Sequence, residues 1–165
     1  HDAVEKIIEK YNFDADKKQI REVLESLAIK EEIAKKIGSK ELKDVFIEEQ
    51  EIIIFETLQR HRNSSWKFFK KEDELKGKIG NIDIKGRVDL ILENDKSELI
   101  IIDLKTGKLP KNKSTEDGNE FQLPFYYQLV TQAYPGRIEG VYYMAVSARE
   151  PGRLEGLANL KSWGY

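Results

Sequence analysis

The stretch from Ile82 to Gly107, IDIKGRVDLILENDKSELIIIDLKTG, predicts the centre of the fold. Two runs rich in β-branched and apolar residues occupy 82–92 and 98–104. The polar segment between them, ENDKS at 93–97, is typical of a turn. We therefore expect the two runs to pair as one β-hairpin.

Two acidic residues face each other in this hairpin if its turn is centred near Lys96. Asp89 and Asp103 are equidistant from that position and would lie opposite each other. Side chains alternate along a strand, so Lys105 shares a face with Asp103. The preceding residues 99–102 are apolar on both faces and should lie inside the sheet. We expect three charged groups to converge on a partly buried patch.

The opposed carboxylates predict a cation site. Like charges on neighbouring strands are destabilising, and burial increases that cost. A divalent cation between Asp89 and Asp103 would offset it, and carboxylates, a backbone carbonyl and waters suit Mg²⁺ or Mn²⁺. Lys105 would then orient or help deprotonate an attacking water, or stabilise charge on a phosphate. The alternative is a solvated or ion-paired surface hairpin, which does not account for the apolar flanks.

Three motifs in order resemble those of a known family. GRVD at 86–89, DLKTG at 103–107 and QLPFY at 122–126 look like the G-x-x-D, D-x-K-T-G and Q-x-x-x-Y signatures of the RecB-like branch of PD-(D/E)XK nucleases. A lone D-x-K motif is common, whereas all three at short spacing are specific. The resemblance implies an α/β fold: an αβββαβ core with a central mixed sheet flanked by helices, and a helical insertion from about Asp14 to His61.

The resemblance also implies a function, metal-dependent hydrolysis of DNA phosphodiester bonds. Asp89, Asp103, the Leu104 carbonyl and His1 would hold Mg²⁺ or Mn²⁺, and Lys105 would position the nucleophilic water. His1 is the weakest of these assignments. With Glu5 one turn further on it resembles the first motif of the family, a helical histidine that reaches the metal, but it could equally be a tag remnant or a frayed end.

Further residues are candidates for DNA binding. In a predicted helix at 121–133, Gln122 and Tyr126 lie one turn apart, and the resemblance assigns both to positioning the strand or the scissile phosphate. Tyr126 could instead be a core aromatic. The net charge of −2 does not indicate a nucleic-acid binder. Lys108 and Lys111, however, belong to a basic run beside the expected site, where a phosphate backbone would need positive charge, although each could also be simply solvated.

Composition narrows the class of protein. The 165 residues amount to about one domain, and 39% hydrophobic with 35% charged residues is typical of a charge-rich globular protein. Because the sequence has no cysteine, disulfides, thiolate zinc sites and an iron–sulfur cluster within this chain are excluded. We find no signal peptide and no apolar run of about 18 residues, so we expect no membrane association and a cytoplasmic location.

We expect a single RecB-like nuclease domain over 1–165, cut from a longer chain. Its parts would be a helical region at 1–63, a catalytic sheet and helix at 66–147, and a tail at 148–165. The resemblance implies exonucleolytic processing of DNA ends in recombination or repair, with a helicase or ATPase as a partner subunit or domain. The alternative from another class is a non-catalytic module that guides or anchors DNA in such a complex.

Apolar spacing outlines the remaining elements. It predicts helices at 1–11, at 16–37 with a break near 28–30, and at 40–61. Strands are expected at 66–78 and at 137–146, the latter parallel to the second hairpin strand after a helical crossover. In the helix at 40–61 we expect Glu51 on the solvent face with Glu48 and Glu49, and His61 as a cap or in solvent. The buried face would comprise Val45, Phe46, Ile52, Ile53, Phe55 and Leu58.

Overall fold

The computed structural model describes residues 1–30, 40–110 and 122–156. The helices in these ranges are α1 (Asp2–Tyr11), α2 (Lys17–Lys30), α4 (Lys40–Gln59) and α6 (Gln122–Ala133). The strands are β1 (Lys67–Ile79), β2 (Ile82–Glu93), β3 (Leu99–Lys105), β4 (Ile138–Ala145) and β5 (Leu154–Gly156). No helix within these ranges is both long enough and apolar enough to cross a membrane. The second helix expected before residue 38 lies outside the described residues.

The described strands form one mixed sheet in the order β1-β2-β3-β4-β5. β1, β2 and β3 pair antiparallel in sequence, and β4 pairs parallel to β3 after the crossover through α6. Both the hairpin and the parallel pairing predicted from the sequence are confirmed. The short β5 pairs antiparallel to β4 in a region where no strand was predicted.

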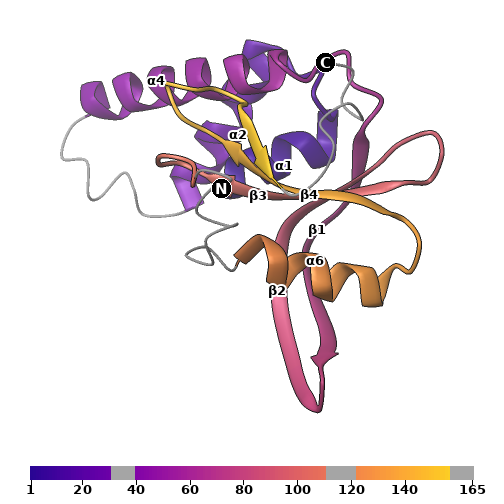
Figure 1. Cartoon of the computed structure of the whole chain (residues 1–165). Coiled ribbons are helices and arrows are strands. Elements are labelled where there is room, and N and C mark those ends of the chain that lie inside the picture. The colour runs from indigo at the N-terminus through magenta and orange to yellow at the C-terminus, as the bar shows by residue number, and fades with distance from the viewer. Residues whose placement is uncertain (31–39, 111–121, 157–165) are drawn as a thin grey trace.

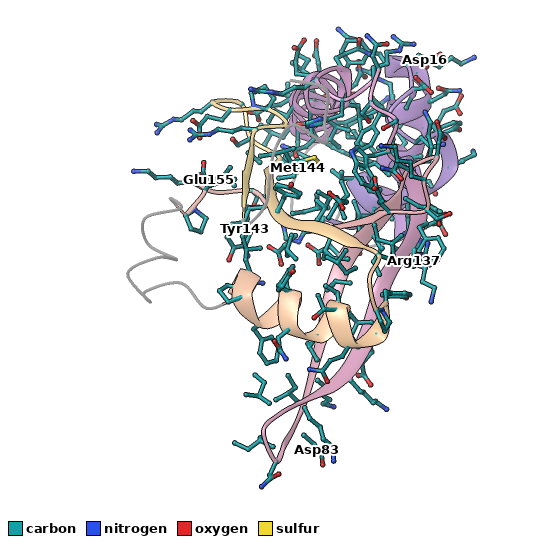
Figure 2. The ribbon with its side chains drawn as sticks, turned by 45° about the vertical axis from the view of Figure 1, so that its right-hand side comes forward. Asp16, Asp83, Arg137, Tyr143, Met144 and Glu155 are labelled. Carbon is teal, nitrogen blue, oxygen red and sulfur yellow. The ribbon has the colours of Figure 1, made fainter. Side chains whose placement is uncertain are left out.

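Helices cover both faces of the sheet, so the expected α/β architecture is confirmed. Figure 1 shows α1, α2 and α4 together on one side of the sheet and α6 on the other. Each side has its own apolar core, because neighbouring side chains of a strand point to opposite faces. On β4, Met144 packs in the core under α1, α2 and α4, whereas Tyr143 packs in the core under α6. Figure 2 shows these two side chains leaving the strand in opposite directions.

The hairpin has the register predicted from its turn. Leu90 pairs with Ile102, and Leu92 pairs with Ile100. Asp89 and Asp103 are the next residues in the same register, immediately beyond the last pair of this ladder. The buried strand β3, enclosed on both faces, thus ends where the two acidic residues meet, and this end of the sheet positions the candidate site.

The buried face of α4 differs from the predicted one. Val45 is 62% exposed and Ile52 is 47% exposed, and Phe46 is also exposed. The prediction holds for Leu58, which is buried, and in part for Ile53 and Phe55, which pack partly buried against the core. The consecutive apolar residues at 45–47 and 52–55 project to several sides of α4, so their spacing does not identify its buried side. The buried residues are Ile47, Glu51, Ile54, Thr57 and Leu58.

Glu51 was predicted on the solvent face and is instead 8% exposed. Its carboxylate lies 2.6 Å from the Arg21 Nε of α2 and accepts a hydrogen bond from it. A buried carboxylate is stable only with such a partner, which the sequence pattern of α4 alone could not reveal. This ion pair between Arg21 and Glu51 links α2 to α4 in the helical layer.

His61 is buried too, contrary to the prediction of a cap or a solvated side chain. The residue is 2% exposed, its Nε2 lies 2.7 Å from the Gly152 carbonyl oxygen, and its ring packs against Phe13. Gly152 can approach because it has no side chain: a Cβ there would lie 2.7 Å from the Thr57 carbonyl oxygen, and its φ is +68°. Burial disfavours the imidazolium and lowers the pKa of His61 to about 4.

This burial predicts a pH dependence of stability. The unfolded ring takes up a proton below its ordinary pKa of 6.5, whereas the folded ring stays neutral down to about pH 4. Protonation between these values therefore favours the unfolded chain. We expect the free energy of unfolding to fall by about 3 kcal/mol as the pH drops from about 6.5 to 4. Denaturant titrations at pH 7, 5.5 and 4.5 measure it, and His61→Gln, which cannot titrate, should lack this component. An equal pH dependence in that variant would contradict the prediction.

Candidate active site

Asp103 lies at the centre of the candidate site. It follows the apolar residues of β3 and is 4% exposed. Its Oδ1 accepts a hydrogen bond from Gln122 Nε2 (2.7 Å), and its Oδ2 lies 2.7 Å from Lys105 Nζ. Burial raises the pKa of Asp103 and the nearby Asp89 carboxylate adds to that rise, while the Lys105 ammonium opposes it. The folded protein therefore keeps a carboxyl group at a position where burial disfavours its ionised form.

Lys105 and Gln122 form a hydrogen-bonded unit with Asp103. Lys105 Nζ donates to Gln122 Oε1 (2.8 Å), and Gln122 Nε2 donates to the Tyr126 hydroxyl (3.0 Å) as well as to Asp103. Gln122 and Tyr126 lie one turn apart on α6, as the sequence predicts. Burial raises the pKa of the Tyr126 phenol, and both aspartates add to this effect. The first turn of α6 therefore fixes the amine and the carboxylate at the end of β3.

Asp89 lies where β2 and β3 separate. Its Oδ2 accepts a hydrogen bond from the backbone N–H of Leu104 (2.7 Å), just beyond the last backbone pair of the ladder. The next carbonyl, that of Lys105, points the other way and accepts from Val146 N–H (2.8 Å). Successive peptide groups of a strand alternate in direction, so the Leu104 carbonyl points toward the Asp89 side, as its N–H does. A carboxylate and a carbonyl thus face the same gap.

Gly86, the first residue of the GRVD motif, lets α6 lie against β2 beside this gap. A Cβ at Gly86 would lie 2.9 Å from Leu129 Cδ1 and 3.1 Å from Phe125 Cε1. Glycine inside a strand commonly marks such a close approach. A larger residue would require the Leu129 and Phe125 side chains to move.

His1 reaches the site from the helical layer. Its Nδ1 lies 3.9 Å from Asp89 Oδ2, and its side chain is 40% exposed. It precedes the first turn of α1, in which the Glu5 N–H donates to the His1 carbonyl (3.1 Å). Glu5 itself is buried. The structure therefore places His1 next to Asp89, as the resemblance implied, although the two side chains are too far apart for a hydrogen bond.

The donors present fit a hard divalent cation that keeps several waters. Within the described residues, Asp103 Oδ2 is buried, lies against the Lys105 ammonium and lacks a hydrogen bond of good geometry. No three His, Cys, Asp or Glu side chains among those residues form a complete metal cage. Two carboxylates and a carbonyl are what Mg²⁺ needs from a protein when waters and a substrate phosphate supply its other ligands. Asp89, Asp103 and Leu104 match that set, with His1 adjacent.

Of the two lysines predicted to bind DNA, the structure describes only Lys108, which is not part of this cluster. Lys108 is exposed on the loop after β3, three residues beyond Lys105. Lys111 lies outside the described residues.

Tyr143 also belongs to the candidate site, although it lies in none of the sequence motifs. This buried residue of β4 pairs in register with Asp103, its hydroxyl donates to Gln122 Oε1 (3.4 Å), and its ring centroid lies 4.9 Å from Lys105 Nζ. The aromatic face favours the ammonium. The sequence predicted the strand and its parallel direction, and only the register with β3 would have identified Tyr143.

One family of known proteins matches almost the whole chain. The family described as the PD-(D/E)XK nuclease superfamily matches residues 1–160. Among solved structures, the chain is similar to protein VC1899 from Vibrio cholerae, with 12% sequence identity and a TM-score of 0.34 over 66% of this chain. The chain spans 27% of the length of that protein. No curated protein matches. By the match over residues 1–160, the chain belongs to the PD-(D/E)XK nuclease superfamily.

Proposed function

We propose that this protein is a deoxyribonuclease that hydrolyses phosphodiester bonds with Mg²⁺ or Mn²⁺. The observation that carries the proposal is the meeting of Asp89, Asp103 and the Lys105 amine where β2 and β3 separate. A narrower role, exonucleolytic processing of DNA ends beside a helicase or ATPase partner, is supported by the three RecB-like motifs alone.

Asp89, Asp103 and the Leu104 carbonyl would hold the cation, with His1 at its edge. When bound, the cation polarises the phosphate and activates a water. Lys105, fixed by Asp103 and Gln122, orients the attacking water and offsets negative charge on the phosphate. The water oxygen bonds to phosphorus, the bond to the departing sugar oxygen breaks, a proton leaves to solvent, and the sugar oxygen takes one from solvent.

Gln122 acts as a positioning residue in this scheme. Its amide oxygen accepts from Lys105 and its amide nitrogen donates to Asp103, so one side chain sets the distance between both groups. Tyr126 and Tyr143 contact that amide from α6 and β4. Groups held by such contacts need little reorganisation during the reaction, which is the main source of electrostatic catalysis.

Loss of either charged group should slow cleavage strongly. We expect Asp103→Asn and Lys105→Gln each to lower the rate on linear DNA by at least about a hundredfold, since each removes charge at the reacting phosphate. Digestion of end-labelled single- and double-stranded DNA with Mg²⁺ or Mn²⁺ measures this rate. The matched controls Asp95→Asn and Lys96→Gln alter exposed turn residues at the other end of β3 and should cleave normally.

The same assay tests the alternative class. DNA binding by the parent chain without any cleavage would contradict the nuclease proposal and support a module that guides or anchors DNA. Undiminished cleavage by Asp103→Asn would show that the chemistry lies elsewhere.

Cation binding should also stabilise the fold. A cation held by the folded chain alone raises the free energy of unfolding by about 1.4 kcal/mol at ten times its Kd, or roughly 3–6 °C in melting midpoint for a chain of this size. Melting curves with and without Mn²⁺ measure the shift. We expect it to disappear in Asp89→Asn and to persist in Asp95→Asn. An unchanged midpoint at millimolar Mn²⁺ in the parent chain would argue against the site.

A further inference from the structure

A groove opens directly beyond the candidate site, where β3 and β4 end. Two loop segments line it: 106–108 after β3, and 147–150 after β4. Its volume is about 590 Å³. We call it the strand-end groove. β3 and β4 are parallel, and their last backbone contact is the Val146 N–H to the Lys105 carbonyl, so the groove begins one residue after the site lysine. Crevices at the carboxyl ends of parallel strands are common ligand sites.

The charge of the groove is positive. Lys108 and Arg149 line the groove, one on each loop; both are exposed, and neither has an ion pair within the described part of the chain. The acid on its lining, Glu150, is already paired with Arg153. The groove is thus lined by two cations that have no carboxylate partner among the described residues, which favours a ligand with negative charge.

The groove also offers hydrogen-bond donors suited to phosphate. Thr106 and Ser147, whose side chains carry hydroxyls, line it, one on each loop. Among the described residues, no atom would contact a Cβ added at Gly107, so this side of the backbone is open to an approaching ligand. An arginine presents a planar pair of donors to phosphate oxygens, and a lysine supplies a compact charge.

We propose that the strand-end groove binds phosphate of the nucleic-acid strand next to the reacting phosphodiester, through Arg149 and Lys108. The inference rests on the proposed nuclease function and adds a substrate-binding residue, Arg149, that lies outside the three sequence motifs. The phosphate belongs either to an internal diester or to a strand terminus. Contact with phosphate gives affinity and register without base specificity.

Binding without divalent cations tests this separately from catalysis. Fluorescence anisotropy with a labelled oligonucleotide gives the association constant K at several salt concentrations. We expect Arg149→Gln to weaken binding about tenfold near 0.1 M salt and to reduce the slope of log K against log salt by roughly 0.7–0.9. Lys96→Gln removes one positive charge at the far end of β3, about 20 Å away by strand length, and should change neither value much. Melting curves confirm that each variant is folded.

Neutral phosphate analogues identify the contact. Replacing the contacted phosphate by an uncharged methylphosphonate should weaken binding of the parent chain and have no further effect in Arg149→Gln. An internal position with this behaviour assigns the groove to a diester. A preference for a 5′-monophosphate that disappears in Arg149→Gln assigns it to a strand terminus.

The outcomes separate the two proposals. Equal affinity and equal salt slope for Arg149→Gln and Lys96→Gln would overturn the groove assignment even if the parent chain cleaves DNA. Arg149-dependent binding in a chain that never cleaves would support the groove and overturn the nuclease activity.

Discussion

The structure is organised around an acidic group, Asp103, held at the end of an apolar strand. Placing a carboxylate in a protein interior is costly unless charged and hydrogen-bonding partners surround it. Here Lys105 and the Gln122 amide provide them, and burial still raises the pKa of the acid. An electrostatic cost of this kind is typical of a functional site, because a purely structural core would replace the acid by an apolar residue.

The surrounding elements follow from that constraint. The backbone pairing of β2 with β3 ends just before the two acids. Beyond it, Asp89 Oδ2 accepts the hydrogen bond from the Leu104 N–H that the backbone of β2 would accept if the pairing continued. Gly86 leaves room for the Leu129 and Phe125 side chains of α6 against β2, and Gln122 at the start of the same helix donates to Asp103. The three motifs therefore form one site. β2 and β3 stop pairing there, and α6 places the Gln122 side-chain amide beside Asp103.

The sequence correctly predicted the features that depend on the pattern of neighbouring residues, such as the hairpin and its register. A polar turn and two apolar runs determine the hairpin register, since a slip by one residue would expose the buried side chains. The sequence-based predictions were wrong where contacts between distant segments determine the environment of a residue. The environment of His61 depends on the turn at Gly152, and that of Glu51 on Arg21 in another helix. On α4 the apolar residues surround the helix, so only the layer packed against it determines which side is buried.

The candidate site shows the same division between local and distant information. Asp89, Asp103 and Lys105 belong to one hairpin and could be placed from its pattern, whereas His1, Gln122 and Tyr143 come from three other parts of the chain. His1 approaches from the helical layer and Gln122 from α6 on the opposite face. The hairpin carries its own cation, Lys105, but the other contacts of its acids come from Gln122 on α6 and from His1 in the helical layer. The complete candidate site therefore requires α6, β4 and the helical layer as well as the hairpin.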